Sequence, residues 1–282
     1  CPNDCTFCNQ KKISGQTKNV KAEDVKNTIE YYLNNFKDDN KYIEVAFFGG
    51  SFTGIDVDKQ KELLSVAYEY IKNKKIDSIR ISTRPDYINK EILKMLKSYG
   101  VKTIELGVQS TNDYILNKSK RGHTFEDVKK ASKLIRKNGF ILGHQMMVGL
   151  PESTRQDEIN TAKDLIKLKP KIVRIYPVLV IKGTQLEKDY ESGEYTPLTV
   201  EQAVETAKDL LVLFNKSSLK NLCISSLPTS ILAISLCALT LNCLNPTLIK
   251  YSSLFSIFLS NSLVIFVPYG ILVARHAKAG LL

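Results

Sequence analysis

Short apolar runs alternate with amphipathic stretches along the first 216 residues. The apolar runs are rich in β-branched residues, as buried strands are, and cover residues 43–48, 78–83, 101–109, 140–148 and 171–177. Between them, apolar residues recur at every third or fourth position, which predicts helices that bury one face. This order of strand, helix and strand predicts an α/β fold with a parallel sheet and right-handed crossovers.

Two helix starts are marked by side chains that can cap the first turn. Thr199 and Gln202 form the Thr-x-x-Gln pattern of a capping box, and Thr124 with Asp127 resembles one. We expect the helix after Thr199 to end near Phe214 and to be the last element of its domain. Because parallel barrels carry their chemistry at the carboxyl ends of the strands, candidate functional residues should follow the apolar runs directly.

Charge divides the chain into two unequal parts. The 282 residues include 40 Lys and Arg and 29 Asp and Glu, which gives a net charge of +11. Residues 217–282 hold only four of these charged residues, all basic. They are Lys220, Lys250, Arg275 and Lys278. The sequence therefore predicts a charged domain over residues 1–216 and an apolar tail of uncertain origin over residues 217–282.

The tail allows three interpretations. Residues 221–274 contain two uncharged runs on either side of Lys250, each long enough to cross a bilayer, so a membrane hairpin is one of them. Pro228, Pro246 and Pro268 interrupt these runs, which favours a second interpretation, a segment foreign to the domain that arises from misjoined or out-of-frame translation. The third is a genuine apolar subdomain. Nothing near the start of the chain is typical of a signal peptide, so we expect a cytoplasmic protein.

Cysteines gather at the start of the chain. Cys1, Cys5 and Cys8 form a C-x3-C-x2-C motif, and the other three of the six cysteines lie in the tail. Three neighbouring cysteines cannot all pair as disulfides, and structural zinc and electron-transfer clusters normally take four ligands. Three thiolates on one loop favour a 4Fe–4S cluster that keeps one iron open to a substrate or cofactor.

This cysteine motif, with Phe7 before its last cysteine, resembles that of the radical S-adenosylmethionine superfamily. Further motifs fit one branch of the superfamily, which contains the radical domain of the Elongator catalytic subunit. Oxygen-independent coproporphyrinogen III oxidases are more distant. The motifs lie at residues 47–52 (FFGGSF), 83–86 (TRPD), 105–110 (ELGVQS), 121–124 (RGHT) and 175–184 (IYPVLVIKGT). The resemblance covers about residues 1–214.

The resemblance implies a partial (βα)6 barrel whose first strand precedes Cys1 and is missing from the chain. It also implies an enzyme that uses a 4Fe–4S cluster to cleave S-adenosylmethionine reductively and so generate a 5′-deoxyadenosyl radical. Cys1, Cys5 and Cys8 would bind the cluster, and a reductant such as flavodoxin or ferredoxin would supply the electron.

The substrate is less well defined by the sequence. Elongator-like proteins act on tRNA wobble uridines, so tRNA is the candidate substrate, and the basic balance of residues 1–216 suits RNA. The acetyltransferase domain of Elongator-like proteins has no counterpart in this sequence. Two alternatives use the same features: a non-catalytic metal-binding RNA module that employs the three thiolates, and a membrane-anchored protein if the tail is genuine.

The same resemblance assigns candidate residues for S-adenosylmethionine. Gly49, Gly50 and Ser51 directly follow a strand and resemble the segment that holds the amino group of the cofactor. Gln109 ends the third strand and is expected near the cofactor. Arg121 stands where related oxidases have an arginine that pairs with the cofactor carboxylate, a task that suits a guanidinium.

One position departs from the family pattern. Related enzymes often have Glu where this chain has Ser82, and a hydroxyl cannot hold a ribose diol as a carboxylate does. Arg84 and Glu105 are candidates to replace it, Glu105 because its strand face is the one expected to meet the cofactor. On the fourth strand, Gln145 is expected to contact the cofactor, whereas His144 is more typical of a packed core residue.

Overall fold

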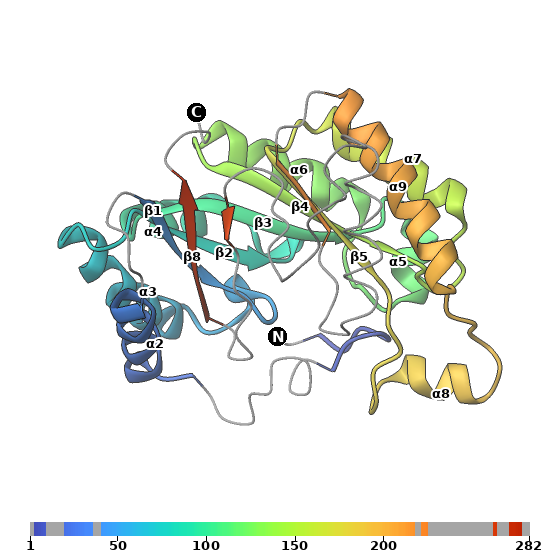
Figure 1. Ribbon diagram of the computed structural model, residues 1–282, viewed down its shortest axis with the longest axis horizontal. Coiled ribbons are helices and arrows are strands. Elements are labelled where there is room, and N and C mark those ends of the chain that lie inside the picture. Colours follow the sequence, from blue (N-terminus) through green and yellow to red (C-terminus); the bar gives the residue numbers. More distant parts are fainter. Residues whose placement is uncertain are drawn as a thin grey trace, which may run out of the picture.

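The computed structural model describes residues 3–9, 20–35 and 41–217, together with the backbones of three strands at residues 221–224, 262–263 and 271–277. Within these residues the strands form one sheet in the order β6-β5-β4-β3-β2-β1-β8-β7 (Figure 1). Strands β1 to β6 are parallel to their neighbours, and β8 and β7 continue from β1 in antiparallel fashion. The strands are β1 (Lys41–Phe47), β2 (Ser78–Thr83), β3 (Val101–Gln109), β4 (Ile141–Val148), β5 (Ile172–Pro177), β6 (Asn221–Ile224), β7 (Ser262–Leu263) and β8 (Ile271–Ala277).

Strands β1 to β5 confirm the five strands predicted from the apolar runs, with bounds that agree within two residues. They form a curled half-barrel that alternates with helices, so the predicted α/β barrel fold is confirmed. The helices are α2 (Ala22–Asn35), α3 (Val57–Lys72), α4 (Lys90–Ser98), α5 (Asp113–Lys118), α6 (Phe125–Lys137), α7 (Arg155–Lys167), α8 (Gln185–Glu191) and α9 (Val200–Lys216), with 3-10 turns η1 (Phe52–Gly54) and η2 (Pro85–Tyr87).

Capping boxes start three of these helices. The Thr124 and Thr199 side chains accept hydrogen bonds from the third helical N–H of α6 and α9, as predicted, and Asp127 and Gln202 return the bond. A third box at Thr154 starts α7. Each box satisfies backbone donors that a helix start would otherwise leave unpaired, so these helices begin at defined residues.

The core lies between the sheet and the helices that cover its outer face (Figure 1). Ile29, Leu64, Leu96, Ile135 and Phe214, from five different helices, are all completely buried there. Burial of each such side chain stabilises the fold by about 1.5–3 kcal/mol. Because successive side chains of a strand point to opposite faces, the polar positions of the same strands are left for the inside of the half-barrel.

The segment beyond residue 216 contributes β6, β7 and β8. The strand that the resemblance implies before Cys1 is not part of this sequence. The structure contains another parallel strand, β6, which pairs with β5 because α9 brings the chain back beside it. In the part of the chain that the structure describes, no helix is long and apolar enough to cross a membrane. The membrane-hairpin interpretation falls largely on residues 225–261 and 264–270, which lie outside the described residues. The domain boundary at residue 216 stays a prediction.

Candidate functional site

The cysteine loop, residues 3–9, is held at the carboxyl end of the strands by its own backbone. The Thr6 N–H donates to the Ser119 carbonyl at 3.2 Å, and the Thr6 carbonyl accepts from the Leu186 N–H at 2.9 Å. The Cys8 N–H closes a tight turn onto the Cys5 carbonyl at 3.0 Å. The loop is therefore fixed on both sides, by the segment after α5 and by the start of α8.

Two thiols of the motif lie in the described residues. Cys5 is buried and Cys8 is half-buried, and neither thiol forms a disulfide within the described residues. They pack in a small apolar cluster that includes Phe7, Leu150 and Leu186. Burial, together with the nearby Cys5, raises the pKa of the Cys8 thiol to about 11. Such a thiol loses its proton when a metal cation takes the proton's place.

Cys1 lies outside the described residues. Accordingly, no group of three metal-ligating side chains occurs among the residues that the structure describes. The donor set nevertheless fits an iron–sulfur cluster, because the two described ligands are thiols, are close in sequence and are shielded from water by apolar neighbours.

Arg121 connects the cysteine loop to the sheet. Its Nη1 donates to Cys5 Sγ at 3.4 Å, and its Nη2 donates to the Gly107 carbonyl oxygen at 2.7 Å. The side chain is only 8% exposed, and its Nε has no partner among the described residues. Arg121 is therefore not a solvated surface arginine, although it follows the basic residues Lys118 and Lys120, and one buried N–H is left to meet a ligand.

Gly107 permits this contact by having no side chain. A Cβ atom at this position would lie 2.6 Å from Arg121 Nη2 and 3.1 Å from Gln109 Nε2. Distances under 3.0 Å are essentially never seen for a real Cβ, so any larger residue would displace the guanidinium. Gly107 lies within the motif at residues 105–110, but the sequence alone gives no sign of this contact.

Gln109 ends β3 in an unusual conformation. Its φ is +70°, and the pairing of β3 with β4 shifts between Gly107 and Gln109. A left-handed backbone at a glutamine costs energy and is seen mainly where a site needs it. Its Oε1 atom is buried and has no partner among the described residues. A free acceptor at Gln109 and a free donor at Arg121 suit the ammonium and carboxylate groups of an amino acid.

The turn after β1 stands close to the start of η2. Gly49 and Gly50 have φ values of +97° and +128°, which only glycine adopts easily. Ser51 follows, and its hydroxyl lies 2.8 Å from the Thr83 hydroxyl and accepts from the Arg84 N–H at 3.2 Å. The turn is thereby fixed against the end of β2.

Ser82 and Gln145 meet inside the half-barrel. The Gln145 Nε2 donates to Ser82 Oγ at 3.2 Å and to Glu105 Oε2 at 3.1 Å. These two candidates therefore lie together, as expected of residues that contact one ligand. The Glu105 carboxylate also pairs with Arg80 and, at 3.0 Å, with Arg174, so it is held by two guanidiniums.

These contacts belong to a charged row of which only Glu105 is a candidate from the sequence. Glu44, Arg80, Glu105 and Arg174 come from β1, β2, β3 and β5, and each is at most 7% exposed. Arg80 Nε donates to Glu44 Oε2 at 2.6 Å, and the Arg80 Nη1 donates to Glu105. Burial raises the pKa of Glu105, but Arg174 and Arg80 outweigh it and hold that pKa below its usual value. Each charge stands between two aliphatic residues of an apolar run, which indicates a buried charge but not its partner.

The two histidines of the site region are neutral. His144 is completely buried, its Nε2 lies 2.9 Å from the Ser132 hydroxyl, and burial lowers its pKa to about 3. It is the packed core residue that we expected. His123 lies two residues after Arg121, and burial together with Arg121 and Arg84 lowers its pKa to about 4. Neither imidazole carries a charge at neutral pH.

The architecture is thus a parallel half-barrel with a thiol loop, two glycines of positive φ and a buried arginine at the carboxyl ends of its strands. Thiols at this end of a parallel barrel suit a metal-binding α/β protein. The Radical SAM superfamily matches residues 1–165, and its C-terminal domain matches residues 170–219. The chain belongs to the Radical SAM superfamily.

Sequence relatives indicate which branch of the Radical SAM superfamily this chain resembles. The chain is 34% identical over 184 residues to the tRNA uridine(34) acetyltransferase of Methanocaldococcus jannaschii, a match that covers 58% of this chain and 34% of the relative. It is 32% identical over 152 residues to human Elongator complex protein 3, covering 53% of this chain and 28% of the relative. The chain thus spans about a third of the length of these relatives.

Solved structures agree with the predicted fold. Elp3 of Methanocaldococcus infernus is 25% identical, with a TM-score of 0.66, and the match covers 78% of this chain and 58% of that one. Coproporphyrinogen III oxidase of Escherichia coli has a TM-score of 0.56 at 16% identity over 77% of this chain and 50% of that one, which shows the shared fold. The predicted resemblance to the Elongator branch, with the oxidases more distant, is confirmed.

Proposed function

We propose that this chain is a radical S-adenosylmethionine enzyme that acts on tRNA. Cys1, Cys5 and Cys8 would hold a 4Fe–4S cluster and leave one iron for the cofactor. When bound and reduced, the cluster supplies the electron that cleaves S-adenosylmethionine into methionine and a 5′-deoxyadenosyl radical. The chain itself binds, orients and shields these groups.

The observation that carries the proposal is the contact of Arg121 with both Cys5 and Gly107. It places a buried cation, with one N–H free, beside a cluster ligand. The carboxylate of a cofactor that binds the open iron would meet this cation, and a charge-assisted bond of this kind is about twice as strong as a neutral one. The buried acceptor of Gln109 would meet the ammonium group.

The remaining candidates supply shape and polarity. Gly49, Gly50 and Ser51 would present backbone groups to the methionine part of the cofactor, and the positive φ of the two glycines makes this turn possible. Ser82 and Gln145, joined by a hydrogen bond, would face the ribose. Glu105 is occupied by two arginines, so a ribose contact from it would have to compete with these ion pairs.

The proposed substrate is supported by the relatives, and the proposed electron donor by the chemistry of the cluster. Two of them are named for tRNA uridine and Elongator activity, which supports tRNA as the substrate class. A one-electron donor such as flavodoxin or ferredoxin is proposed because the cluster must be reduced. A cytoplasmic location is proposed because residues 1–216 have the charged composition of a cytosolic domain.

The test is anaerobic reconstitution of the full chain with iron and sulfide, then reduction by dithionite with S-adenosylmethionine. Chromatography should show 5′-deoxyadenosine, and the protein should hold about four irons. A protein that binds zinc in preference to iron and yields no 5′-deoxyadenosine would support the metal-binding RNA module and overturn the proposal.

A further inference from the structure

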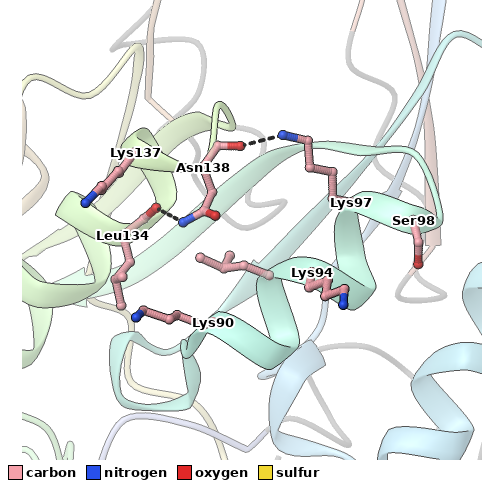
Figure 2. A pocket seen from close by; sticks show the side chains of 8 residues that line it. Lys90, Lys94, Lys97, Ser98, Leu134, Lys137 and Asn138 are labelled. Atoms are coloured by element: carbon pink, nitrogen blue, oxygen red, sulfur yellow. Dashed lines mark hydrogen bonds between the residues drawn. The ribbon is translucent and has the colours of Figure 1, made fainter.

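A groove of about 670 Å³ lies between α4 and α6, on the outer helical layer of the half-barrel. Leu93 of α4 and Leu134 of α6 line its floor. Four lysines stand along it: Lys90, Lys94 and Lys97 on α4, and Lys137 at the end of α6 (Figure 2). All four are exposed, and no carboxylate lines the groove. The site residues described above lie on the inner side and the mouth of the half-barrel, so this groove is a separate surface.

The α4 lysines form a straight row. They occupy positions i, i+4 and i+7, which fall on one face of a helix. At 1.5 Å per residue the row is about 10 Å long. The row is therefore long enough to meet several successive phosphates of one nucleic-acid strand. Lys97 Nζ also donates to the Asn138 carbonyl at 3.0 Å and ties α4 to the end of α6.

These lysines differ from the ion-paired lysines of the surface. At least one lysine on each of α3, α6, α7 and α9 forms an ion pair with a carboxylate three residues away, as Lys59, Lys72 and Lys167 do. Within the described residues, none of the four groove lysines has a carboxylate partner. Their charge is therefore not neutralised by the chain itself and is available to an anionic partner.

We propose that the groove between α4 and α6 binds the phosphodiester backbone of RNA. An acidic protein surface is the weaker candidate, because carboxylates favour the paired N–H groups of arginine, whereas an ammonium serves phosphates as a point charge. Phosphate contacts position an RNA without reading its sequence, so the groove would hold the substrate from outside the barrel. The choice of RNA among phosphate polymers rests on the proposed function.

The test compares two variants of the full chain with equal charge changes. The groove variant is Lys90→Ala, Lys94→Ala, Lys97→Ala and Lys137→Ala. The control, Lys59→Ala, Lys61→Ala, Lys72→Ala and Lys167→Ala, removes four ion-paired surface lysines. Binding of a labelled tRNA transcript is followed by fluorescence anisotropy over a range of salt concentrations. The groove variant should bind about 10- to 100-fold more weakly and lower the slope of log affinity against log salt by about 3.

The control should keep the wild-type slope. Equal weakening in both variants would show a bulk charge effect and overturn the groove. Binding of tripolyphosphate and of flavodoxin is measured on the same variants. If the groove variant loses only tripolyphosphate binding, the groove is a site for small phosphates, and if it loses only flavodoxin binding, the groove is a protein-docking surface. Either result overturns the RNA assignment.

The readout also separates this inference from the proposed function. Without RNA, the groove variant should form 5′-deoxyadenosine at the wild-type rate, because its substitutions lie outside the half-barrel. If the wild-type protein forms no 5′-deoxyadenosine, the proposed function fails. The tRNA-binding measurement still shows whether the groove binds RNA.

Discussion

Arg121 shows how much one side chain can depend on its neighbours. Its guanidinium reaches Cys5 only because Gly107 leaves the space for it, and Gly107 lies on a different element from either. The sequence shows that residue 121 is an arginine, but its contact with the Cys5 thiol depends on how the chain folds. Substitutions at single residues therefore test the site most directly.

We expect Arg121→Ala to weaken S-adenosylmethionine binding and leave the iron content unchanged. Loss of a charge-assisted contact should cost about 1.5–3 kcal/mol, or roughly 10- to 100-fold in affinity. Equilibrium binding by the reconstituted protein measures it. The matched control is Arg136→Ala, which removes a surface arginine bound to the Leu168 carbonyl. An unchanged dissociation constant for the Arg121 variant would remove Arg121 from the cofactor site.

We expect Cys5→Ser to abolish cluster binding, because two remaining thiolates are too few to hold the cluster and the described residues around the loop offer no third metal-ligating group. Iron analysis and visible absorbance after reconstitution give the result. Cys237→Ser, outside the motif, should reconstitute like wild type. A Cys5→Ser protein that still holds about four irons would show that the cluster ligands lie elsewhere.

At the scale of elements, the loop after β4 is joined to α7 by a buried carboxyl. Gly149, with φ of +82°, donates its N–H to Glu158 at 2.6 Å, and its carbonyl accepts from the Tyr195 hydroxyl at 2.7 Å. Burial raises the pKa of Glu158 from 4.5 to about 7, despite that hydrogen bond. The folded chain therefore holds this proton at a pH where the unfolded chain has released it.

This difference predicts how stability depends on pH. The stability linked to Glu158 is fully present below pH 4.5 and is lost as pH rises through about 7. Its total is at most about 3 kcal/mol. Urea unfolding at several pH values should show a steeper loss for wild type than for Glu158→Gln, which cannot ionise. Glu91→Gln, at an exposed carboxyl, should behave like wild type. Parallel pH profiles for wild type and Glu158→Gln would contradict the prediction.

The elements were predictable for a simple reason. A buried parallel strand is a short run of mostly apolar residues, and such a run can be recognised from the local sequence alone. For this reason β1 to β5 were predicted. The family motifs likewise contain Cys5 and Arg121, which the fold brings into contact. The ion pairs of Arg80 and the left-handed backbone of Gln109 were not predictable, because both depend on which strands become neighbours.

At the scale of the whole molecule, the open question is the segment beyond residue 216. Its strand β6 extends the parallel sheet from β5, while β8 pairs along the whole of β1. The rest of the segment holds few charges, and exposed apolar chain of this kind promotes aggregation. A tail foreign to the domain should therefore be removable.

We expect a chain ending at residue 224 to keep its iron, because β6 is retained and the backbone of the cysteine loop forms no hydrogen bond with β7 or β8 in the described residues. It should aggregate less than the full chain, because the uncharged runs are removed, although β1 loses β8 as its neighbour. A chain ending at residue 216 should also bind iron but should unfold at a lower temperature, since the edge of β5 loses its neighbour. Iron analysis, size-exclusion chromatography and thermal unfolding compare the three. If ending at residue 224 causes loss of iron or unfolding, the tail is a genuine part of the fold.

The charged row of Glu44, Arg80, Glu105 and Arg174 has a consequence for folding as well as for the site. A strand that slips by one residue turns every side chain to the opposite face. Here the slip would press one charge into the aliphatic layer beneath the helices and leave its partners unpaired, which costs about 3–5 kcal/mol for a broken buried pair. A sheet with the wrong register is therefore less stable, and the charged row favours one register for the four strands.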